Sequence, residues 1–153
     1  MEAGKHVLCE KPIALSVEDV RKLMAVRDRT GMMIGEAFMV RSHPQWLKAR
    51  ELVQKGSLGQ VKSIQGFFSY YNSDENNIRN VAEYGGGGLW DIGCYPVNTS
   101  RFIFGEEPVK VLALTELDPA FKVDRLASAI LQFPSGQAVF SCATQLAGRQ
   151  RMT

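Results

Sequence analysis

The pattern of apolar and polar positions predicts a strand and then a helix at the start of the chain. Residues 5–10 form a short apolar run, which we expect to be a strand that ends at Lys11-Pro12, because proline pushes the preceding residue into extended backbone. Ser16 is then predicted to cap a helix, with Asp19 in the capping-box position and apolar residues at helical spacing after it. This first piece has α/β character.

The middle of the chain is predicted to contain two strands and two helical segments, with a polar loop before the second helical segment. Residues 32–40 are apolar enough for a buried strand, and Pro44 opens a second predicted helix. Residues 60–71 are rich in β-branched and aromatic side chains and predict a long strand. A polar loop without a core pattern follows, and four successive glycines then lead into a helical segment over residues 89–104.

The last third of the chain is predicted to be β-structure. Strands are expected over residues 109–116, 125–133 and 137–145, and Pro-Ser-Gly between the last two is a hairpin signal. Helices followed by sequential strands favour an α+β fold, with a mainly antiparallel open sheet and helices on one of its faces.

Composition narrows the class of protein. The 153 residues are 45% apolar and 22% charged, which is typical of a globular domain with its own core. The net charge of +2 and the scattered Lys and Arg weigh against nucleic acid as the main partner, and no apolar run is long enough to span a membrane. Three widely spaced cysteines, an odd number, favour a reducing compartment, so we expect a cytoplasmic location.

Both ends of the sequence are interpreted as cut ends. Gly4 stands where a helix C-cap would, with almost no helix before it, and the last strand-like run stops at GRQRMT. We therefore expect the chain to be an excerpt of a longer protein.

Asp91 and Tyr95 are the first candidates for chemistry. Their i, i+4 spacing places both side chains on one face of a helix, and Pro96 should kink that helix and leave a backbone carbonyl free beside them. One interpretation is a carboxylate that holds a phenol which exchanges a proton with a substrate hydroxyl. The alternative is a half-buried tyrosine beside a solvent-exposed aspartate.

Other polar positions leave two interpretations open as well. Lys11, at a strand end, is either a cation placed in a site or a surface lysine. The run Gly85 to Gly88 is either a phosphate cradle or a flexible loop, and no GxGxxG or P-loop pattern occurs in the chain. Arg41, Asn77 and Arg79 lie in flanking loops, with capping or surface roles as the alternative. The two histidines are too isolated for a metal site, so no metal is predicted.

Several segments together resemble successive motifs of one protein family. In order, they are EAGKHVLCEKPIA, GEAFMVRSHPQW, NIR, GGGGLWDIGCYPVN and RFIFGEEP. They resemble the glucose-fructose oxidoreductase, inositol dehydrogenase and rhizopine-catabolism protein family (Gfo/Idh/MocA). The resemblance implies a two-domain dehydrogenase, with residues 1–13 as the last strand of a truncated Rossmann domain and residues 14–153 as the α+β substrate domain, truncated at its C-terminus.

The resemblance also implies roles for single residues. Lys11 matches the active-site lysine of the family and Asp91 matches the aspartate of its motif. Many members have histidine where this chain has Tyr95, but the glucose-fructose oxidoreductase, dihydrodiol dehydrogenase and xylose dehydrogenase branch has tyrosine. This implies a sugar-like alcohol or hemiacetal as substrate and NADP or NAD as cofactor. The resemblance places Glu10, Lys11, Pro12 and Arg41 around the cofactor.

The hypothesis that follows is hydride transfer assisted by proton transfer. A phenol ionises near pH 10 in water, so it needs a nearby cation to act as a base at neutral pH, and Lys11 would be that cation for Tyr95. Asp91 would orient the substrate or Tyr95. We expect the isolated chain to be inactive and to self-associate through its open sheet as a homo-oligomer. The alternative is a catalytically silent sheet module for oligomerisation or ligand binding.

Overall fold

The computed structural model describes residues 1–153 and divides them into two compact units, Met1–Met39 and Val40–Thr153. The boundary expected from the sequence, after residue 13, lies inside the first unit. The strand Ile34–Glu36, after this point, pairs with the strand Val7–Cys9 before it.

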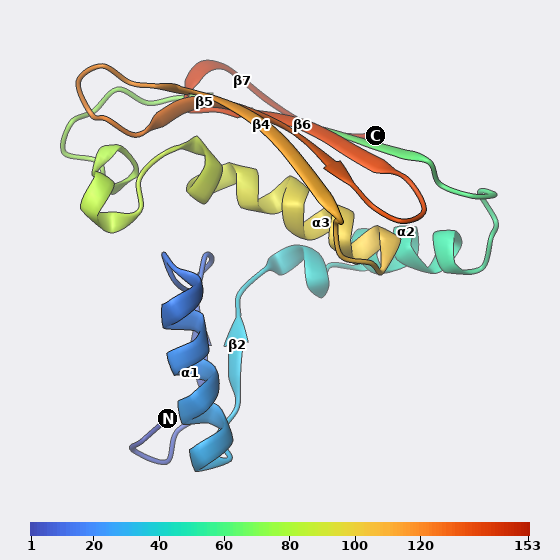
Figure 1. The fold of residues 1–153 in the computed structure, drawn as a ribbon, viewed down its shortest axis with the longest axis horizontal. Coiled ribbons are helices and arrows are strands. Elements are labelled where there is room, and N and C mark those ends of the chain that lie inside the picture. The colour runs from blue at the N-terminus through green and yellow to red at the C-terminus, as the bar shows by residue number, and fades with distance from the viewer. The chain divides into compact units, whose positions relative to one another are not determined.

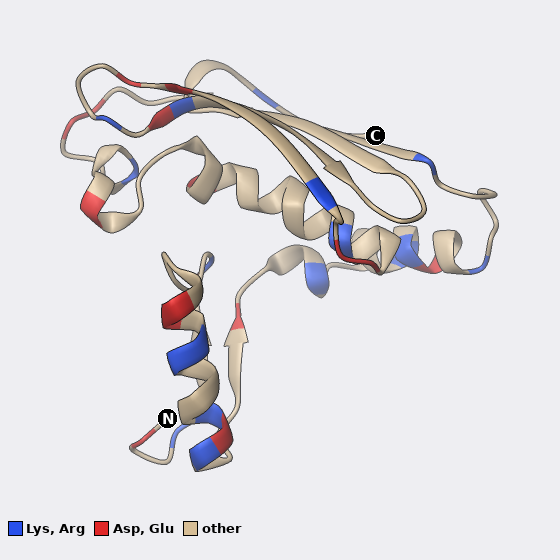
Figure 2. Ribbon diagram, viewed as in Figure 1, with Lys and Arg blue, Asp and Glu red and all other residues tan.

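The first unit is a β-α-β arrangement. Strands β1 (Val7–Cys9) and β2 (Ile34–Glu36) pair in parallel, and helix α1 (Val17–Thr30) connects them. Ser16 caps α1 as predicted, since its Oγ accepts a hydrogen bond from the Asp19 N–H at 3.1 Å. Basic and acidic side chains alternate along this helix (Figure 2).

Of the buried strand predicted over residues 32–40, only Ile34–Glu36 form a strand, and this strand is half-buried to exposed. The partner strand β1 offers only three residues before the chain reaches Pro12, which has no N–H to continue a ladder. After Glu36 the chain turns instead: the Phe38 N–H donates to the Glu36 carbonyl at 2.9 Å, and residues 39–41 form a 3₁₀ turn.

The second unit contains two α-helices, a π-helical turn and five strands. Its elements are α2 (Pro44–Gln54), β3 (Ser63–Tyr71), 3₁₀ turns at Ile78–Asn80 and Ala82–Tyr84, the π-helical turn Leu89–Gly93, α3 (Cys94–Phe104), β4 (Lys110–Leu117), β5 (Asp124–Gln132), β6 (Gln137–Ala143) and β7 (Gln145–Met152). Helices thus precede most of the strands, as the sequence predicts.

The five strands form one open sheet in the order β4-β5-β6-β3-β7. Three of its four pairings are antiparallel, and only β3 and β6 run parallel. Helices α2 and α3 lie along one face, and the other face is uncovered (Figure 1). The predicted α+β fold with a mainly antiparallel sheet is therefore confirmed.

The predicted strand over residues 137–145 is two strands. The chain breaks at Thr144, whose N–H donates to the Arg125 carbonyl at 3.0 Å while its carbonyl accepts from the Asn72 N–H at 2.8 Å. The Thr144 N–H is thus still bonded to β5, but its carbonyl is bonded to the residue after β3, and the chain leaves the β5–β6 ladder and runs back as β7 along β3.

The core lies between the sheet and the two helices of the second unit. Alternate strand residues face the helices and are buried, and they pack with residues of the helical segment: Ile64, Ala127, Leu131, Ala138, Phe140 and Cys142 from the strands, and Ile92, Phe102 and Ile103 from the helical segment. The uncovered face exposes apolar side chains, among them Leu112, Leu114 and Ile130.

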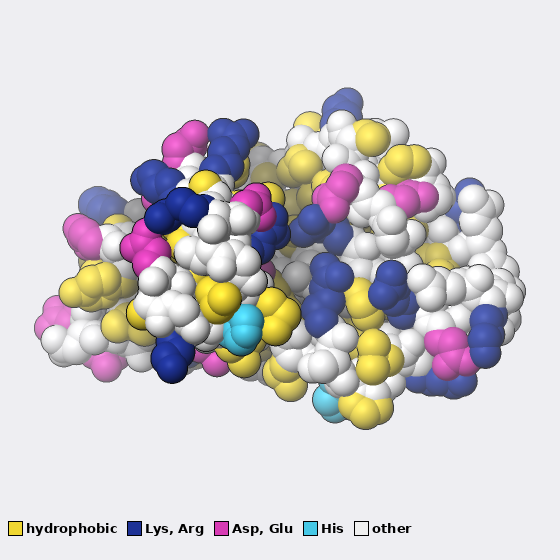
Figure 3. Space-filling model, turned by 90° about the horizontal axis from the view of Figure 1, so that it is seen from below, with side chains coloured by type: hydrophobic (Ala, Val, Ile, Leu, Met, Phe, Trp, Pro, Cys, Tyr) yellow, Lys and Arg dark blue, Asp and Glu magenta, His cyan; other side chains and the backbone are white.

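Charges lie mostly outside the strands (Figure 2). On the face shown in Figure 3, Lys and Arg side chains lie among acidic and apolar ones. No helix of the chain has both the length and the apolar character needed to cross a membrane.

Candidate active site

Three of the predicted site residues follow directly after β1. Glu10, Lys11 and Pro12 lie at the edge where both parallel strands of the first unit end. The carboxylate of Glu36, the last residue of β2, accepts a hydrogen bond from the Ile13 N–H at 2.8 Å and so holds this segment at that edge. The carboxyl ends of parallel strands are where nucleotides bind in open α/β sheets.

Arg41, the fourth predicted cofactor residue, belongs to the second unit. Its Nε donates to Asn98 Oδ1 of α3 at 2.8 Å, and its guanidinium lies 5.0 Å from the centre of the Phe102 ring. Arg50 of α2 lies 4.6 Å from the centre of the same ring. A hydrogen bond and a cation–π contact therefore orient Arg41 against α3.

The glycine run is a close-packed turn. The Gly86 N–H donates to the Val81 carbonyl at 3.0 Å, and the Gly87 N–H donates to the Arg79 carbonyl at 2.8 Å. A Cβ at Gly86 would lie 2.7 Å from the Arg79 carbonyl oxygen, so a side chain does not fit there. Because these N–H groups bond to the chain itself, the turn does not offer them to a phosphate.

The helical segment after the glycines begins with a π-helical turn, Leu89–Gly93, and becomes α-helical at Cys94. Pro96 follows closely and has no N–H for the carbonyl one turn before it, which is a common cause of such local widening. The predicted free carbonyl beside Asp91 and Tyr95 is not found, because the Ile92 carbonyl accepts a hydrogen bond from the Cys94 N–H. Asp91 lies within the widened turn.

Asp91 is held by two side chains from other elements. Its Oδ2 accepts hydrogen bonds from the Tyr70 hydroxyl at 2.7 Å and from Arg79 Nε at 3.1 Å. The Asp91 side chain is 16% exposed, whereas that of Arg79 is 47% exposed. Burial and then the hydrogen bond to Asp91 raise the pKa of Tyr70, so this phenol stays protonated and acts as a donor.

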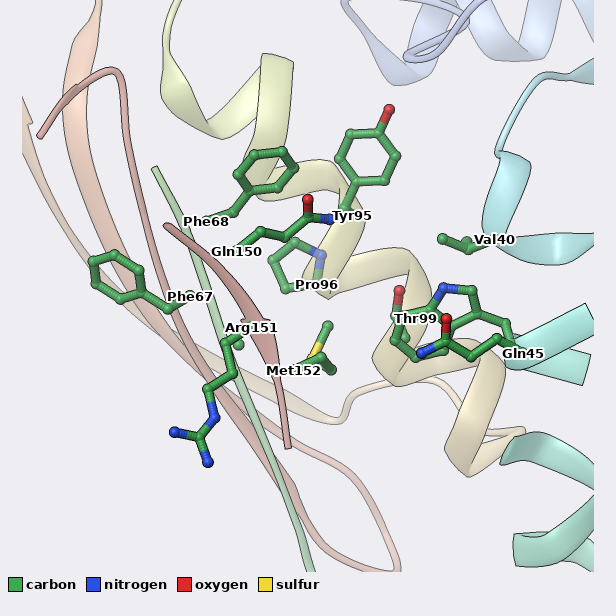
Figure 4. A pocket seen from close by; sticks show the side chains of 12 residues that line it. Val40, Gln45, Phe67, Phe68, Tyr95, Pro96, Thr99, Gln150, Arg151 and Met152 are labelled. Atoms are coloured by element: carbon green, nitrogen blue, oxygen red, sulfur yellow. The ribbon is translucent and has the colours of Figure 1, made fainter. Parts of the chain in front are cut away.

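Tyr95 lies one helical turn after Asp91 and lines a pocket of about 290 Å³. Its ring lies 5.9 Å from that of Phe68, centre to centre. Figure 4 shows the Tyr95 hydroxyl pointing away from Pro96 and Met152. The other lining residues come from the 3₁₀ turn 39–41, α2, α3 and the two neighbouring strands β3 and β7, and include Gln45, Trp46, Thr99 and Gln150. The pocket is therefore a partly apolar hollow beside a phenol.

Sequence reasoning missed Tyr70 and the role of Arg79 at this site. The orientation of Tyr70 can be predicted from the sequence: it lies an even number of residues from Ile64 and Phe68 on β3 and so faces the helices. Arg79 was noted only as a loop residue of the NIR motif. No cluster of three His, Cys, Asp or Glu side chains in the chain could hold a metal ion.

The chain thus consists of a β-α-β unit followed by an α+β domain with one uncovered sheet face. Residues 46–153 match the GFO/IDH/MocA C-terminal domain, and residues 1–38 match the oxidoreductase family with an NAD-binding Rossmann fold. The chain belongs to the GFO/IDH/MocA family, and the resemblance drawn from its motifs is confirmed.

Named relatives agree with this assignment. An uncharacterized oxidoreductase, ORF334 of Rhizobium meliloti, is 51% identical over 99% of this chain and 46% of its own length. D-xylose 1-dehydrogenase (NADP(+)) 2 of Haloferax volcanii is 36% identical over 88% of this chain and 41% of its own length. The chain thus spans less than half the length of these curated relatives.

A solved structure shows the same fold. A 3-ketoreductase from Actinomadura kijaniata, in complex with NADP and TDP-benzene, superposes with a TM-score of 0.89 at 27% identity. The match covers 99% of this chain and 47% of the other.

Proposed function

We propose that this chain forms the substrate-handling part of an NAD(P)-dependent oxidoreductase that acts on a sugar-like alcohol or hemiacetal. The observation that carries the proposal is the helical segment of a family domain that presents a held carboxylate, Asp91, and a pocket-lining phenol, Tyr95, one turn apart. The relatives named above support a sugar-like substrate and a nicotinamide cofactor.

In this proposal Tyr95 moves the proton. During oxidation it takes the proton of the substrate hydroxyl, and during reduction it returns that proton to the carbonyl oxygen. Asp91 accepts hydrogen bonds from Tyr70 and Arg79, so its carboxylate is fixed in place and can orient a substrate hydroxyl. The neighbouring pocket would take the rest of the substrate.

Lys11 supplies the positive charge of the proposed site. An ammonium near a developing phenolate or alkoxide stabilises it, and we assign this role to Lys11. Glu10, Lys11 and Pro12 fit the nicotinamide end of a cofactor, because they follow the carboxyl end of a parallel strand. Hydride exchange is the chemistry that bound NAD or NADP would supply. Arg41 is assigned to the same cofactor.

These 153 residues alone are expected to turn over no substrate. The GxGxxG fingerprint that holds the pyrophosphate does not occur among them. Activity should therefore be assayed in the longest reading frame that contains the chain, with NADP and NAD and a panel of aldoses and polyols, and the 153-residue chain should be assayed in parallel.

Substitution of Lys11 tests the proposal, with substitution of another lysine of the same unit as the matched control. Lys11→Ala should lower kcat by about 10²- to 10³-fold, the range seen when one electrostatic stabiliser is removed. Lys5→Ala removes an exposed lysine from the same unit and should leave kcat unchanged. Turnover of no aldose or polyol by the longer protein, or equal kcat for both variants, would refute the proposal.

A second function, assembly, is favoured by the uncovered sheet face. Leu112, Leu114 and Ile130 are 58%, 82% and 41% exposed on it, and exposed apolar patches of this kind mark interaction surfaces. We propose that copies of the protein associate through this face. Light scattering should find an oligomer that Leu114→Lys dissociates, and a wild-type monomer at micromolar concentration would contradict assembly.

A further inference from the structure

Asp124 connects the sheet to the start of the helical segment. It is the first residue of β5, and its Oδ2 accepts a hydrogen bond from the Leu89 N–H at 2.7 Å. Asp124 pairs with Leu117 of β4, and from Leu126 on β5 is paired with β4 on one side and β6 on the other, so Asp124 stands at the start of a strand that is held on both sides. The bond therefore ties the first residue of the π-helical turn to the sheet.

Two glycines make room for this carboxylate. A Cβ at Gly87 would lie 2.1 Å from Asp124 Oδ1, and Gly87 has a φ of 111°, which disfavours any side chain. A Cβ at Gly88 would lie 3.3 Å from Asp124 Oδ2. The approach of Asp124 thus accounts for these two positions of the glycine run.

The same turn leads to the proposed site through backbone hydrogen bonds. The Asp91 N–H donates to the Gly87 carbonyl at 3.1 Å, and the Gly87 N–H donates to the Arg79 carbonyl at 2.8 Å. Arg79 in turn donates to the Asp91 carboxylate. A displacement of the turn at Leu89 would therefore move Asp91 and one of the groups that hold it.

The other side of the turn is packed just as closely. A Cβ at Gly93 would lie 2.9 Å from Cys142 Sγ of β6. Burial, with a smaller contribution from the charge of Asp124, raises the pKa of Cys142 to about 12, so the thiol stays neutral. The turn is thus held by a hydrogen bond to β5 and by contact with β6.

We propose that Asp124 is a positioning residue for the reaction, because its carboxylate fixes the start of the Leu89–Gly93 turn on the sheet and so sets where Asp91 and Tyr95 lie. This inference rests on the proposed function. A misplacement of about 1 Å at a reacting group costs about 10²-fold in rate, so Asp124 affects turnover without contact to the substrate.

The pKa of Asp124 distinguishes a role in positioning from a role in stabilising the fold. Burial raises the pKa of Asp124, although the N–H groups of Leu89, Asp124 itself and Gly88 lower it. A carboxyl whose pKa is higher in the folded than in the unfolded state lowers stability as the pH rises from the unfolded value, near 3.8, through the folded one. The negative charge of Asp124 therefore adds no stability at neutral pH.

The test compares two aspartates of the β4–β5 hairpin region in the longest reading frame that contains the chain. Asp124→Asn places an NH₂ group where backbone N–H groups point, so kcat per folded molecule should fall about 10²-fold, with KM within about twofold. Asp118→Asn is the matched control. Asp118 accepts from the Ala120 and Phe121 N–H groups at 2.8 and 2.9 Å, so its substitution should lower Tm and leave kcat unchanged.

An Asp124→Asn variant with wild-type kcat, or one in which kcat per folded molecule is unchanged and only Tm falls, would overturn the inference. If the wild-type protein turns over none of the substrates, the proposed function fails, and amide hydrogen exchange then decides on the positioning role. In that case the amides of residues 89–95 should exchange faster in Asp124→Asn than in wild type. Equal exchange rates would overturn the positioning role as well.

Discussion

The two halves of the helical segment Leu89–Phe104 are held in different ways. In the first half, Ile92 packs in the core, but hydrogen bonds from other elements fix Leu89 and Asp91: Asp124 accepts from the Leu89 N–H, and Tyr70 and Arg79 donate to Asp91. In the second half, burial does so, because Phe102 and Ile103 are almost fully enclosed by the core.

This difference separates the geometry of the proposed site from the stability of the fold. Hydrogen bonds are directional and define positions closely, whereas apolar burial is non-directional and scales with the area removed from water. Substitutions that remove these hydrogen bonds in the first half should therefore change turnover more than stability. Substitutions in the second half should do the reverse.

The largest effect on stability is expected at Phe102. Its side chain is 3% exposed and contacts the guanidinium groups of Arg41 and Arg50. Phe102→Ala should cost about 3–5 kcal/mol of the free energy of unfolding, measured in urea. Leu58→Ala, at a residue that is 64% exposed in the turn after α2, is the control and should have little effect. A cost for Phe102→Ala below about 1 kcal/mol would contradict the comparison.

A smaller energetic effect, on turnover, is expected at Asp91. Asp91→Asn keeps the size of the side chain but removes the charge that Tyr70 and Arg79 hold. We expect kcat to fall about 10²-fold, equivalent to about 2.7 kcal/mol. Steady-state kinetics and thermal unfolding on the same sample check this. Unchanged kcat together with a large fall in Tm would show that Asp91, like the second half of the segment, serves stability, and would contradict the comparison.

The smallest effect is expected at the end of the segment, where Arg101 pairs with Glu107 at 2.6 and 2.7 Å. Both side chains are well exposed, so Glu107→Gln should change stability by at most about 1 kcal/mol. Arg101 lowers the pKa of Glu107, so this contribution exists above pH 4.5 and fades as the pH falls through the lowered pKa. Thermal unfolding of both proteins across that range measures it. A Tm difference that grows at lower pH would contradict the ion pair.

Local signals predicted much of the fold. The Ser16 cap, Pro44 at a helix start and the Pro-Ser-Gly hairpin act within a few residues, and each occurs as expected. The break at Thr144 and the parallel pairing of β3 with β6 depend on bonds to distant segments. No local sequence pattern predicts either of these two features.

The candidate site divides in the same way. Asp91 and Tyr95 can be predicted as site residues from the sequence, because their i, i+4 spacing and the family motif that contains them are local patterns. Tyr70 and Asp124 lie 21 and 35 residues from their partners, and only the folded sheet brings them there.

The most direct test of the account is a paired measurement of kcat and Tm for Tyr95→Phe in the longest reading frame that contains the chain, with Tyr84→Phe, at an exposed tyrosine, as control. Loss of the hydroxyl should lower kcat by about 10²- to 10⁴-fold and leave Tm unchanged. Wild-type kcat in Tyr95→Phe would remove Tyr95 from proton transfer and contradict the account.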